Sequence, residues 1–501
     1  MNVLDSIARQ ARAHPDRTAV INDGDAISYS ALWRSAAGVA AHLVRAGIQQ
    51  GQCVAVSGLR MQADLVVVMA LARIGAISTY FRAGQTDAVR REIFARNQVV
   101  AWIGHPDAIG GDDIKLIPIG DLVQPLGEDA VLPPLVSGLD DQVWRIASSS
   151  GTTGVSKSIP FTHARTARQQ QLSFEAWPIQ ADEKLLLLAD LGIGFSLGHC
   201  MQQLSAGATV VFLKELLAPE MAASLKRDRP TRILSTPAVM TRLTGYLRRL
   251  PESERFKPDS LRSVMLGGSI VPPGLRAEVR QLLCPNLIVN YGSTEMGSTA
   301  RAGVQIAREH PGAAGRLVPW VEGQAVDVAG NPLPPGQTGI LRFRSPVMVQ
   351  GYVGDEKATA AAFRDGWFYP GDTGSIDEGR IVRLGGRSDD VINLLGVKLD
   401  PSRVEEALNS HPSVKESAVT LSAQASRRPV LVLLVVAADE SAPPQESALK
   451  AHVIASMGSL HEPSRVQVVA SLPRTDAGKL ARAQLPSLAD GTQARGNEIS
   501  T

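Results

Sequence analysis

Apolar and polar positions follow one pattern over most of the chain. From residue 1 to about 385, short apolar runs alternate with stretches whose apolar residues recur at helical spacing, such as 29–46 and 64–74. Strands that alternate with helices are typical of layered α/β domains with largely parallel sheets. Ligands of such domains bind at the carboxyl ends of the strands, so polar turns that follow apolar runs are the places to search for a site.

The pattern changes in the last third of the chain. Between 321 and 352, alternating positions and the turn Ala329-Gly330-Asn331-Pro332 predict a small antiparallel β-barrel. After Asp389, the chain predicts a compact α+β unit that begins with a helix, for which Asp400 is the N-cap and Pro401 the first residue. The expected elements are a helix over 401–410, strands over 414–421 and 429–437, a helix over 446–457 and a strand over 465–471.

The length of the chain, 501 residues, exceeds what one hydrophobic core normally serves. We therefore expect an α/β protein with a large N-terminal domain over 1–388, made of layered α/β sheets and the small β-barrel. A small α+β C-terminal domain over 389–486 follows it. The polar tail over 487–501 has no evident apolar anchor, and we expect it to be disordered.

Composition excludes several classes of protein. The chain has 51 basic and 49 acidic residues and a net charge of +2, which gives no electrostatic footprint for nucleic acid. The longest apolar runs, 65–72 and 430–438, are far shorter than the ~20 residues that span a bilayer. The N-terminus lacks the apolar core of a signal peptide, and three cysteines without paired spacing fit a reducing compartment. We expect a cytoplasmic protein with no membrane span.

The first candidate site is a loop rich in hydroxyls and glycines that follows the apolar run 143–147. Glycines allow close backbone approach, hydroxyls donate hydrogen bonds, and the amides of such a turn converge on an anion. The loop differs from the P-loop because its lysine lies three residues beyond the glycine instead of directly after it. The residues expected to cradle a polyphosphate are Ser149, Ser150, Gly151, Thr152, Thr153, Gly154 and Lys157.

Two apolar runs end in polar turns. The run 261–266 leads to Gly268 and Ser269, and the run 286–289 leads to the segment Asn290-Tyr291-Gly292-Ser293-Thr294-Glu295. In that segment, an aromatic ring can stack on a purine and an asparagine amide can bond its exocyclic amine, while a threonine can donate to phosphate and a glutamate can hold Mg²⁺. The alternative for either segment alone is a strand that ends in an ordinary polar turn.

Three further segments complete the pattern. They are Tyr369-Pro370-Gly371-Asp372-Thr373-Gly374, the charged and apolar run 386–398, and Pro473-Arg474-Thr475-Asp476-Ala477-Gly478-Lys479. Taken alone, Pro-Gly-Asp is an ordinary turn, and a lysine near the C-terminus is usually a solvated charge.

In this order, the segments resemble the signature of the adenylate-forming superfamily, which contains acyl-CoA synthetases, peptide-synthetase adenylation domains and luciferase. The resemblance extends over almost the whole chain. It implies that the turn at Gly268 lies against adenine and that Asp372 and Arg387 bind the ribose. It also implies a hinge at Asp389 and a mobile C-terminal domain, with Gly396 in the pantetheine channel and Lys479 as the adenylation lysine.

The resemblance implies a ligase that uses ATP, Mg²⁺ and CoA. A small-molecule carboxylic acid attacks the α-phosphate, pyrophosphate leaves, and the acyl-adenylate is transferred to CoA; Lys479, Thr294 and Glu295 are the expected catalytic residues. One alternative is a stand-alone adenylation enzyme that loads a carrier-protein phosphopantetheine. Another is a non-catalytic nucleotide-binding homologue, against which the joint presence of Lys479, Glu295, Asp372 and Arg387 argues.

The sequence indicates only weakly which carboxylic acid is the substrate. Amino-acid-activating relatives place an aspartate where Gly194 falls in this chain, which disfavours an amino acid as substrate. Asp190 fills that role if the alignment is shifted, although an aspartate of an ordinary turn is the simpler interpretation. We interpret His199 as a packed histidine and not as a base.

Overall fold

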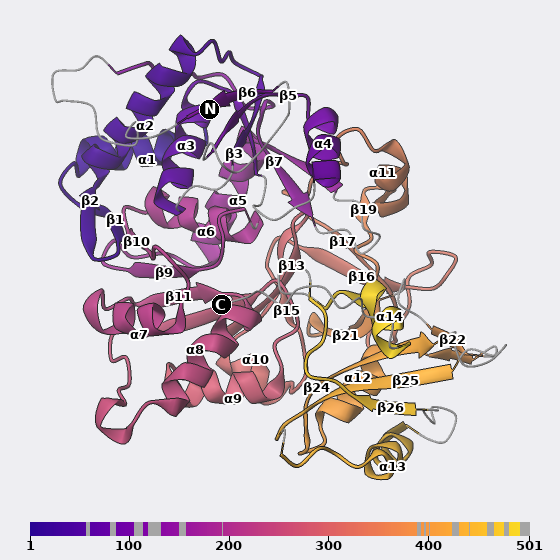
Figure 1. The fold of residues 1–501 in the computed structure, drawn as a ribbon. Helices are drawn as coiled ribbons and strands as arrows, with labels where there is room; N and C mark the ends of the chain where they lie inside the picture. The colour runs from indigo at the N-terminus through magenta and orange to yellow at the C-terminus, as the bar shows by residue number, and fades with distance from the viewer. Residues whose placement is uncertain are drawn as a thin grey trace. The chain divides into compact units, whose positions relative to one another are not determined.

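The computed structural model describes residues 1–56, 61–80, 87–104, 114–118, 132–149, 157–192, 194–387, 392–394, 397–399, 401–422, 430–439, 441–457, 465–474 and 480–490 (Figure 1). The chain divides into two compact units. The first comprises 1–149, 156–322 and 343–368, and the second comprises 150–155, 323–342 and 369–501. The domain boundary at 388/389 therefore stays a prediction. No helix in the described ranges has the length and apolar character needed to cross a bilayer.

The first unit contains a six-stranded sheet in the order β6-β5-β3-β4-β7-β8. All neighbours are parallel except β8, which pairs antiparallel with β7. Beside it lies the helix α3, Met61–Arg73, whose residues 64–73 are all buried; its central run 65–72 is apolar on every side, as such burial requires. The strands are β3 Cys53–Val56, β4 Ile77–Tyr80, β5 Val99–Ile103, β6 Lys115–Ile117, β7 Val143–Ser149 and β8 Lys157–Thr162.

The same unit contains the strand series β2-β1-β10-β9-β11-β12-β13-β14-β15. From β1 to β13 the neighbours are parallel, so their polar turns collect at one edge. At that edge β14 returns antiparallel to β13. The strands are β1 Thr18–Asn22, β2 Asp25–Ser28, β9 Lys184–Leu188, β10 Thr209–Phe212, β11 Arg232–Ser235, β12 Ser263–Gly267, β13 Leu287–Ser293, β14 Gly297–Ala302 and β15 Gly315–Leu317.

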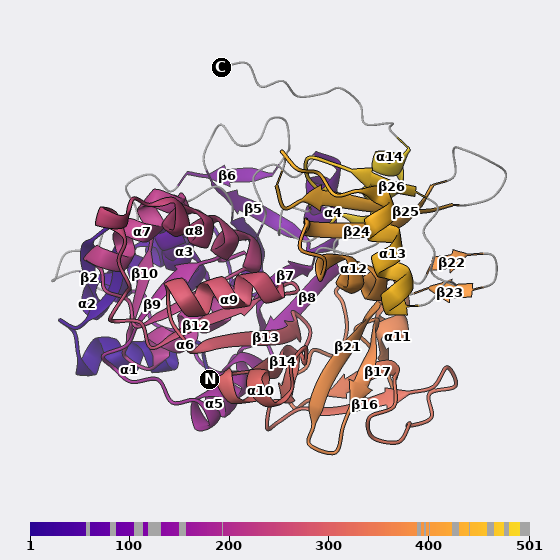
Figure 2. The ribbon, with the colours of Figure 1, turned by 90° about the horizontal axis from the view of Figure 1, so that it is seen from below.

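Helices cover both faces of this strand series. Figure 2 shows α7 (Ala218–Arg227), α8 (Pro237–Arg249) and α9 (Pro273–Leu282) on one side and α6 (Gly194–Ser205) on the other. Apolar side chains of α7, α8 and α9 form one core with those of the strands, including Met221, Met240, Leu275, Leu186, Val264 and Leu287. This double coverage explains why the strands are continuous apolar runs. The unit also contains α1 Asp5–Ala13, α2 Tyr29–Arg45, α4 Asp87–Arg96, α5 His163–Ala176, α10 Val304–Glu309, α11 Glu356–Ala362, β18 Phe363–Arg364 and β19 Trp367–Phe368.

The second unit begins with antiparallel strands. β16 (Glu322–Val326) pairs with β17 (Gly339–Arg344), β17 pairs with β20 (Asp372–Ile376), and β20 pairs with β21 (Ile381–Arg387). The pairs β17–β20 and β20–β21 are antiparallel, whereas the small β-barrel expected over 321–352 stays a prediction. A short hairpin of β22 (Ile392–Leu394) and β23 (Val397–Leu399) follows.

The α+β module of the second unit matches the sequence prediction closely. Its elements are α12 Pro401–Asn409, β24 Val414–Ser422, β25 Val430–Ala437, α13 Glu446–Met457 and β26 Arg465–Val468. β25 pairs antiparallel with β24 and parallel with β26. Val404 and Leu408 of α12 are fully buried against one face of this sheet, as their helical spacing predicts.

The folded chain continues beyond the predicted end at residue 486, which corrects the expectation of a disordered tail from residue 487. Helix α14, Leu485–Ala489, packs on the second face of the sheet, with Leu485 and Ala489 buried against Val432 and Leu434. Leu485, Leu488 and Ala489 supply the apolar anchors that the sequence analysis missed. Residues 491–501 lie outside the described part of the chain.

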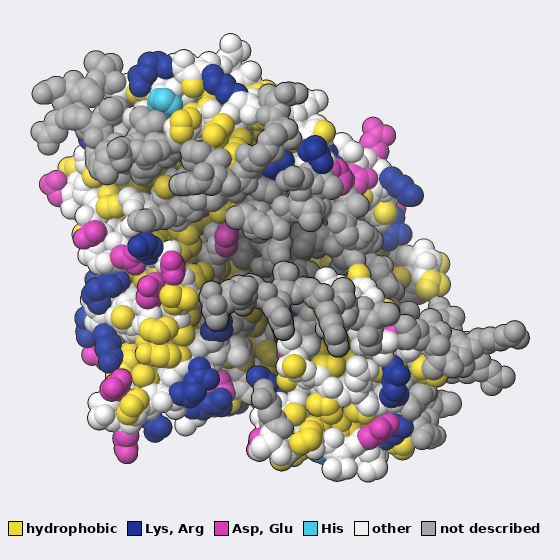
Figure 3. Space-filling view, viewed as in Figure 1, with side chains coloured by type: hydrophobic (Ala, Val, Ile, Leu, Met, Phe, Trp, Pro, Cys, Tyr) yellow, Lys and Arg dark blue, Asp and Glu magenta, His cyan; other side chains and the backbone are white. Residues whose placement is uncertain are grey.

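Charges are evenly mixed where they are visible. On the face shown in Figure 3, basic and acidic side chains of the described residues are interspersed, in line with the balance of 51 basic and 49 acidic residues in the whole chain. The three cysteines, Cys53, Cys200 and Cys284, are free, in line with their unpaired spacing, and all three are buried.

Candidate functional site

The two polar turns of the first unit lie on neighbouring strands. β12 and β13 are parallel, and Gly267 pairs with Asn290. Gly268 has a φ of +91°, a conformation that favours glycine. A Cβ added to Gly292 would lie 2.1 Å from the carbonyl oxygen of Gly297, so the β13–β14 hairpin requires glycine there. The structure thus places both turns at one edge of the strand series.

The predicted nucleotide-binding residues of these two turns have different surroundings. The Tyr291 ring is partly exposed and packs edge-on against Phe343, with 6.0 Å between the ring centroids. Ser269 is exposed, and Ser293 accepts a hydrogen bond from the backbone N–H of Met296. Asn290 Oδ1 already accepts hydrogen bonds from Ser298 and Arg301, so both of its lone pairs are used. The adenine roles stay predictions, and that of Asn290 would need these bonds to change.

Glu295 lies in a contact series that sequence reasoning did not find. It is 7% exposed, and its Oε1 accepts a hydrogen bond of 2.8 Å from the hydroxyl of Tyr352. The ring of Tyr352 in turn lies 4.8 Å from Lys157 Nζ, within cation–π range. Tyr352 therefore connects the predicted metal ligand with the lysine of the predicted phosphate loop.

The backbone of Glu295 is held independently of its carboxylate. Its carbonyl oxygen accepts hydrogen bonds from Arg165 Nη2 at 3.3 Å and from Val349 N at 3.0 Å. Arg165 stacks on Phe161 with 4.2 Å between the guanidinium carbon and the ring centroid. Burial lowers the pKa of Arg165 to about 9, and the charge of Glu295 opposes that shift. Glu295 thus has a fixed position next to a buried positive charge.

The donor set around Glu295 fits a magnesium ion. In the described part of the chain, Oε2 of Glu295 has no hydrogen-bond partner, which leaves one hard oxygen for a cation. No group of three or more acidic, histidine or cysteine side chains suited to a metal occurs among the described residues. Mg²⁺ held by one carboxylate and by substrate phosphates does not need such a group.

The phosphate loop connects two paired strands. β7 and β8 are antiparallel neighbours, and Ser149 pairs with Lys157 at their ends. Lys157 is therefore the first residue of the strand that follows the predicted phosphate loop. Ser150, Gly151, Thr152, Thr153 and Gly154 lie outside the described residues, as do Asp389, Gly396 and Lys479. Their roles stay predictions.

The two predicted ribose ligands meet in the second unit. Asp372 begins β20, Arg387 ends β21, and the two residues are paired across the sheet. Arg387 Nη1 lies 3.3 Å from Asp372 Oδ1 and donates a 2.8 Å hydrogen bond to the carbonyl oxygen of Pro370. Both side chains stay partly exposed, at 32% for Arg387 and 17% for Asp372. They present a cation and an anion side by side, as a site for a polar group requires.

The segment before α6 is shaped by tight packing. Asp190 Oδ1 accepts a 2.6 Å hydrogen bond from the backbone N–H of Gly192, as an aspartate in an ordinary turn does. A Cβ on Gly192 would lie 2.2 Å from the ring of Tyr80, so the glycine lets that ring pack. A Cβ on Gly194 would lie 3.0 Å from Thr294, which places the start of α6 against the predicted catalytic threonine.

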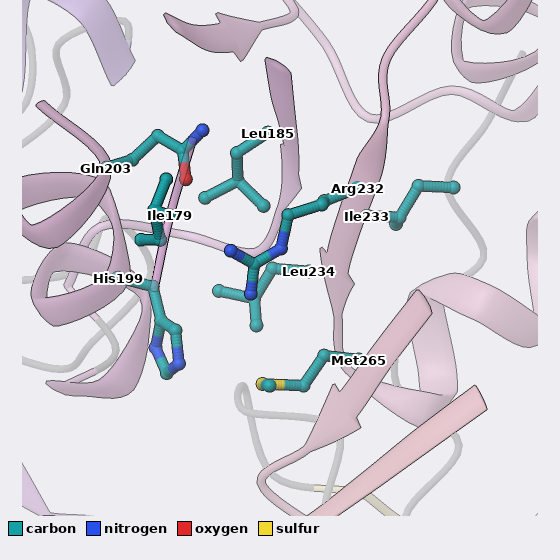
Figure 4. A pocket seen from close by; sticks show the side chains of 8 residues that line it. All are labelled: Ile179, Leu185, His199, Gln203, Arg232, Ile233, Leu234 and Met265. Atoms are coloured by element: carbon teal, nitrogen blue, oxygen red, sulfur yellow. The ribbon is translucent and has the colours of Figure 1, made fainter. Parts of the chain in front are cut away.

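A small cavity opens further along α6. It is lined by His199 and Gln203 of α6, by Arg232 and Leu234 of β11, and by Met265 of β12 (Figure 4). Its volume of about 10 Å³ is near the least that holds one water molecule. Arg232 points from β11 toward α6 and forms an ion pair with Glu183 at 3.1 Å.

His199 and Arg301 define the electrostatics of this region. Burial lowers the pKa of His199 to about 3, with the charge of Arg301 as the next cause. His199 Nδ1 lies 2.8 Å from the carbonyl oxygen of Phe195, so it carries the proton and Nε2 is an acceptor. Burial and the charge of Arg232 lower the pKa of Arg301 to about 9. Sequence reasoning missed Arg301 because a single arginine in a strand has no motif.

Comparison with known proteins identifies the class. The family model "AMP-binding enzyme" matches residues 7–353, and the model of the C-terminal domain of AMP-binding enzymes matches residues 403–479. The chain therefore belongs to the AMP-binding enzymes, the adenylate-forming superfamily. It is a ligase of that class, and the expectation from its ordered motifs is confirmed.

Similar proteins match almost the whole chain. A feruloyl-CoA synthase of Amycolatopsis sp. is 28% identical over 493 residues, which cover 95% of this chain and 97% of the relative. An indoleacetate–CoA ligase of Aromatoleum aromaticum is 28% identical and covers 96% and 97% of the two chains. The structure of the amide bond synthetase McbA of Marinactinospora thermotolerans is 25% identical with a TM-score of 0.84, covering 96% of this chain and 99% of the other.

Proposed function

We infer that the protein is an AMP-forming aryl-CoA synthetase. The carboxylate of an aromatic acid attacks the α-phosphate of ATP, pyrophosphate leaves, and the thiol of CoA then displaces AMP from the acyl-adenylate. The observation that carries this proposal is the contact series Glu295–Tyr352–Lys157, which connects the carboxylate expected to hold the metal with the lysine expected to bind phosphate. Full-length similarity to CoA ligases of aromatic acids supports the acid class and the acceptor.

Each site residue within the described part of the chain has its own role in this reaction. Lys157 neutralises charge on the leaving phosphates, and Thr294 donates to a phosphate oxygen. A magnesium ion on Glu295 would add charge neutralisation to the phosphates when bound. Asp372 accepts hydrogen bonds from the ribose hydroxyls, and Arg387 orients it. Catalysis of phosphoryl chemistry is mainly positioning and electrostatic stabilisation, which is what these groups supply.

A second acceptor is a carrier protein. A fatty acid–[acyl-carrier-protein] ligase of Streptomyces coeruleorubidus is 30% identical over 351 residues, which cover 68% of this chain and 65% of that protein. The pantetheine thiol is chemically the same in CoA and in a carrier protein, so the adenylation site alone does not separate them.

The test is a panel of carboxylic acids scored by pyrophosphate release in the presence of ATP and Mg²⁺. The panel holds benzoates, phenylpropenoates, saturated fatty acids and amino acids. The proposal predicts release with aromatic acids and little with amino acids or fatty acids. Pyrophosphate release with amino acids, or no pyrophosphate release with any acid of the panel, would reject the proposal.

A further inference from the structure

One face of helix α5 contacts the turn that contains Glu295. Arg165, in the first turn of α5, donates from Nη2 to the carbonyl oxygen of Glu295 at 3.3 Å. Gln169 follows one helical turn later on the same face, and a Cβ added to Gly297 would lie 2.6 Å from its Nε2. Two side chains of α5 therefore hold the backbone around the carboxylate that is proposed to bind magnesium.

The guanidinium of Arg165 is a charge with few polar partners. Arg165 is half-buried, but its Nε and Nη1 are removed from solvent and have no hydrogen-bond partner in the described part of the chain. The guanidinium carbon lies 4.2 Å from the ring centroid of Phe161, which is an apolar neighbour. A charge removed from water costs free energy unless hydrogen bonds or an opposite charge compensate it. Arg165 therefore needs a negative charge nearby.

The carboxylate of Glu295 supplies this negative charge. A glutamate side chain spans four bonds beyond Cα, so its carboxylate stays within roughly 10 Å of a group that bonds the carbonyl oxygen of the same residue. Burial lowers the pKa of Arg165 to about 9, and the charge of Glu295 opposes that shift. Salt screens buried charges much less than exposed ones, so the interaction is effective over this distance. Glu295 therefore stabilises the arginine as well as the metal ion that it is proposed to hold.

A metal ion and Arg165 consequently compete for one carboxylate. Lys157 adds a second positive charge, because its Nζ lies 4.8 Å from the ring of Tyr352, whose hydroxyl bonds Glu295. Two cations, Arg165 and Lys157, thus accompany one anion, Glu295. A free divalent cation is repelled by both, whereas the phosphates of ATP bring negative charge that offsets this repulsion.

We propose that Arg165 makes metal binding at Glu295 depend on the nucleotide. The arginine weakens the site for a free divalent cation, and the phosphates of ATP compensate for its charge. The site therefore takes up the metal ion together with ATP and releases it together with pyrophosphate, and the coupling between the two ligands is reciprocal. Arg165 acts through Glu295 and is a positioning residue of the metal site. This inference rests on the proposed function, which places the metal on Glu295.

The test measures binding of Mn²⁺, a paramagnetic substitute for Mg²⁺, to the nucleotide-free protein by electron paramagnetic resonance. Arg165→Gln keeps an N–H donor and removes the charge. It should bind Mn²⁺ at least about tenfold more tightly than wild type, because repulsion between charges within roughly 10 Å exceeds that factor at an effective dielectric constant of about 20. Arg165→Lys keeps the charge and should bind Mn²⁺ as weakly as wild type. A merely structural role predicts the opposite sign, so unchanged or weaker binding by Arg165→Gln would overturn the inference.

Controls assign the gain in Mn²⁺ affinity to Glu295. The double variant Arg165→Gln/Glu295→Gln should lose the gain, and a gain that persists would contradict the inference. Arg168→Gln is the matched control and should behave as wild type, since Arg168 is an exposed arginine of the same helix that bonds Gln171. A melting temperature for each variant shows whether it is folded. If Arg165→Gln does not fold, Arg165→Met also removes the charge and should show the same gain.

A second measurement uses α,β-methylene ATP, an analogue that is not cleaved at the reacting bond. Calorimetry compares its binding with and without Mg²⁺. Arg165→Gln should bind the metal-free analogue about tenfold more weakly than wild type, because a positive charge near the phosphates is lost. It should lose less affinity for the Mg²⁺ complex, because repulsion of the metal is lost as well. Equal losses for both forms would contradict the coupling.

The outcomes distinguish this inference from the proposed function, because neither binding measurement needs a carboxylic acid or an acceptor thiol. Pyrophosphate release with aromatic acids but no gain in Mn²⁺ affinity in Arg165→Gln rejects the inference alone. Absence of release with every acid of the panel, together with that gain, rejects the aryl-CoA synthetase and supports the role of Arg165. Wild type and Glu295→Gln should bind Mn²⁺ about equally without nucleotide, and a much tighter wild type would overturn the inference without any variant of Arg165.

Discussion

The hydroxyl of Tyr352 donates a 2.8 Å hydrogen bond to Oε1 of Glu295, across 57 residues of sequence. The bond fixes one oxygen of the carboxylate and leaves the other oriented as a ligand. Because metal ligands depend on the groups that orient them, Tyr352 is a positioning residue for the magnesium that Glu295 is proposed to hold.

Tyr352→Phe should raise the Mg²⁺ concentration needed for half-maximal pyrophosphate release by about tenfold, because loss of an orienting hydrogen bond typically costs 10- to 100-fold in metal affinity or activity. The readout is initial rate against Mg²⁺ at saturating ATP. Tyr246→Phe, on helix α8, is the control and should behave as wild type. An unchanged Mg²⁺ dependence in Tyr352→Phe would show that the bond does not serve the metal.

Asp372→Asn and Arg387→Ala should each raise the KM for ATP far more than that for the acid. Both residues are expected at the ribose, and a hydrogen bond to a charged group contributes about 1.5 to 3 kcal/mol. Because the two side chains are 3.3 Å apart, the double variant should lose less than the sum of the two single losses. Steady-state kinetics with each substrate varied in turn measure this. Equal effects on both substrates would place the pair outside the nucleotide site.

Lys479→Ala should reduce acyl-adenylate formation at least about 100-fold while leaving thioester formation from a supplied acyl-adenylate nearly intact. The reason is that the resemblance assigns this lysine to the first half-reaction only. Single-turnover measurements of each half-reaction provide the comparison. The idea of two conformations fails if both half-reactions fall together.

Low pH should destabilise the fold through protonation of His163. Its Nδ1 accepts a 2.9 Å hydrogen bond from the backbone N–H of Val3, and burial lowers its pKa from 6.5 to about 4. Between these values the unfolded chain binds more protons than the folded one, so the free energy of unfolding falls as pH decreases from 6.5 toward 4. His163→Gln should weaken this dependence by on the order of 1 kcal/mol. Urea unfolding at pH 4.5 and 7 of both proteins measures it, and an identical pH dependence would exclude His163.

The periodicity of apolar residues predicts the helices and strands that are determined by residues close together in the sequence. The α+β module was predicted element by element because Val404 and Leu408 recur at helical spacing and 430–437 is a continuous apolar run. The short helix α14 was missed because five residues with a proline near their start are too few to show helical periodicity, and its anchors, Leu485 and Ala489, find their partners only in the folded sheet.

The site was predicted only in part for the same reason. Glu295, Asp372 and Arg387 belong to ordered motifs, so the sequence identifies them. Tyr352, Arg165 and Arg301 contribute through contacts with residues that the chain brings close only on folding, and no spacing rule indicates them.

The most direct test of the account is the mass of the products formed from ATP, Mg²⁺, a hydroxybenzoate and CoA. We expect an aryl-CoA thioester together with AMP and pyrophosphate in equal amounts. A parallel reaction replaces CoA with a phosphopantetheinylated carrier protein. ADP and phosphate as products, or acylation of the carrier protein with no acyl-CoA, would contradict the account.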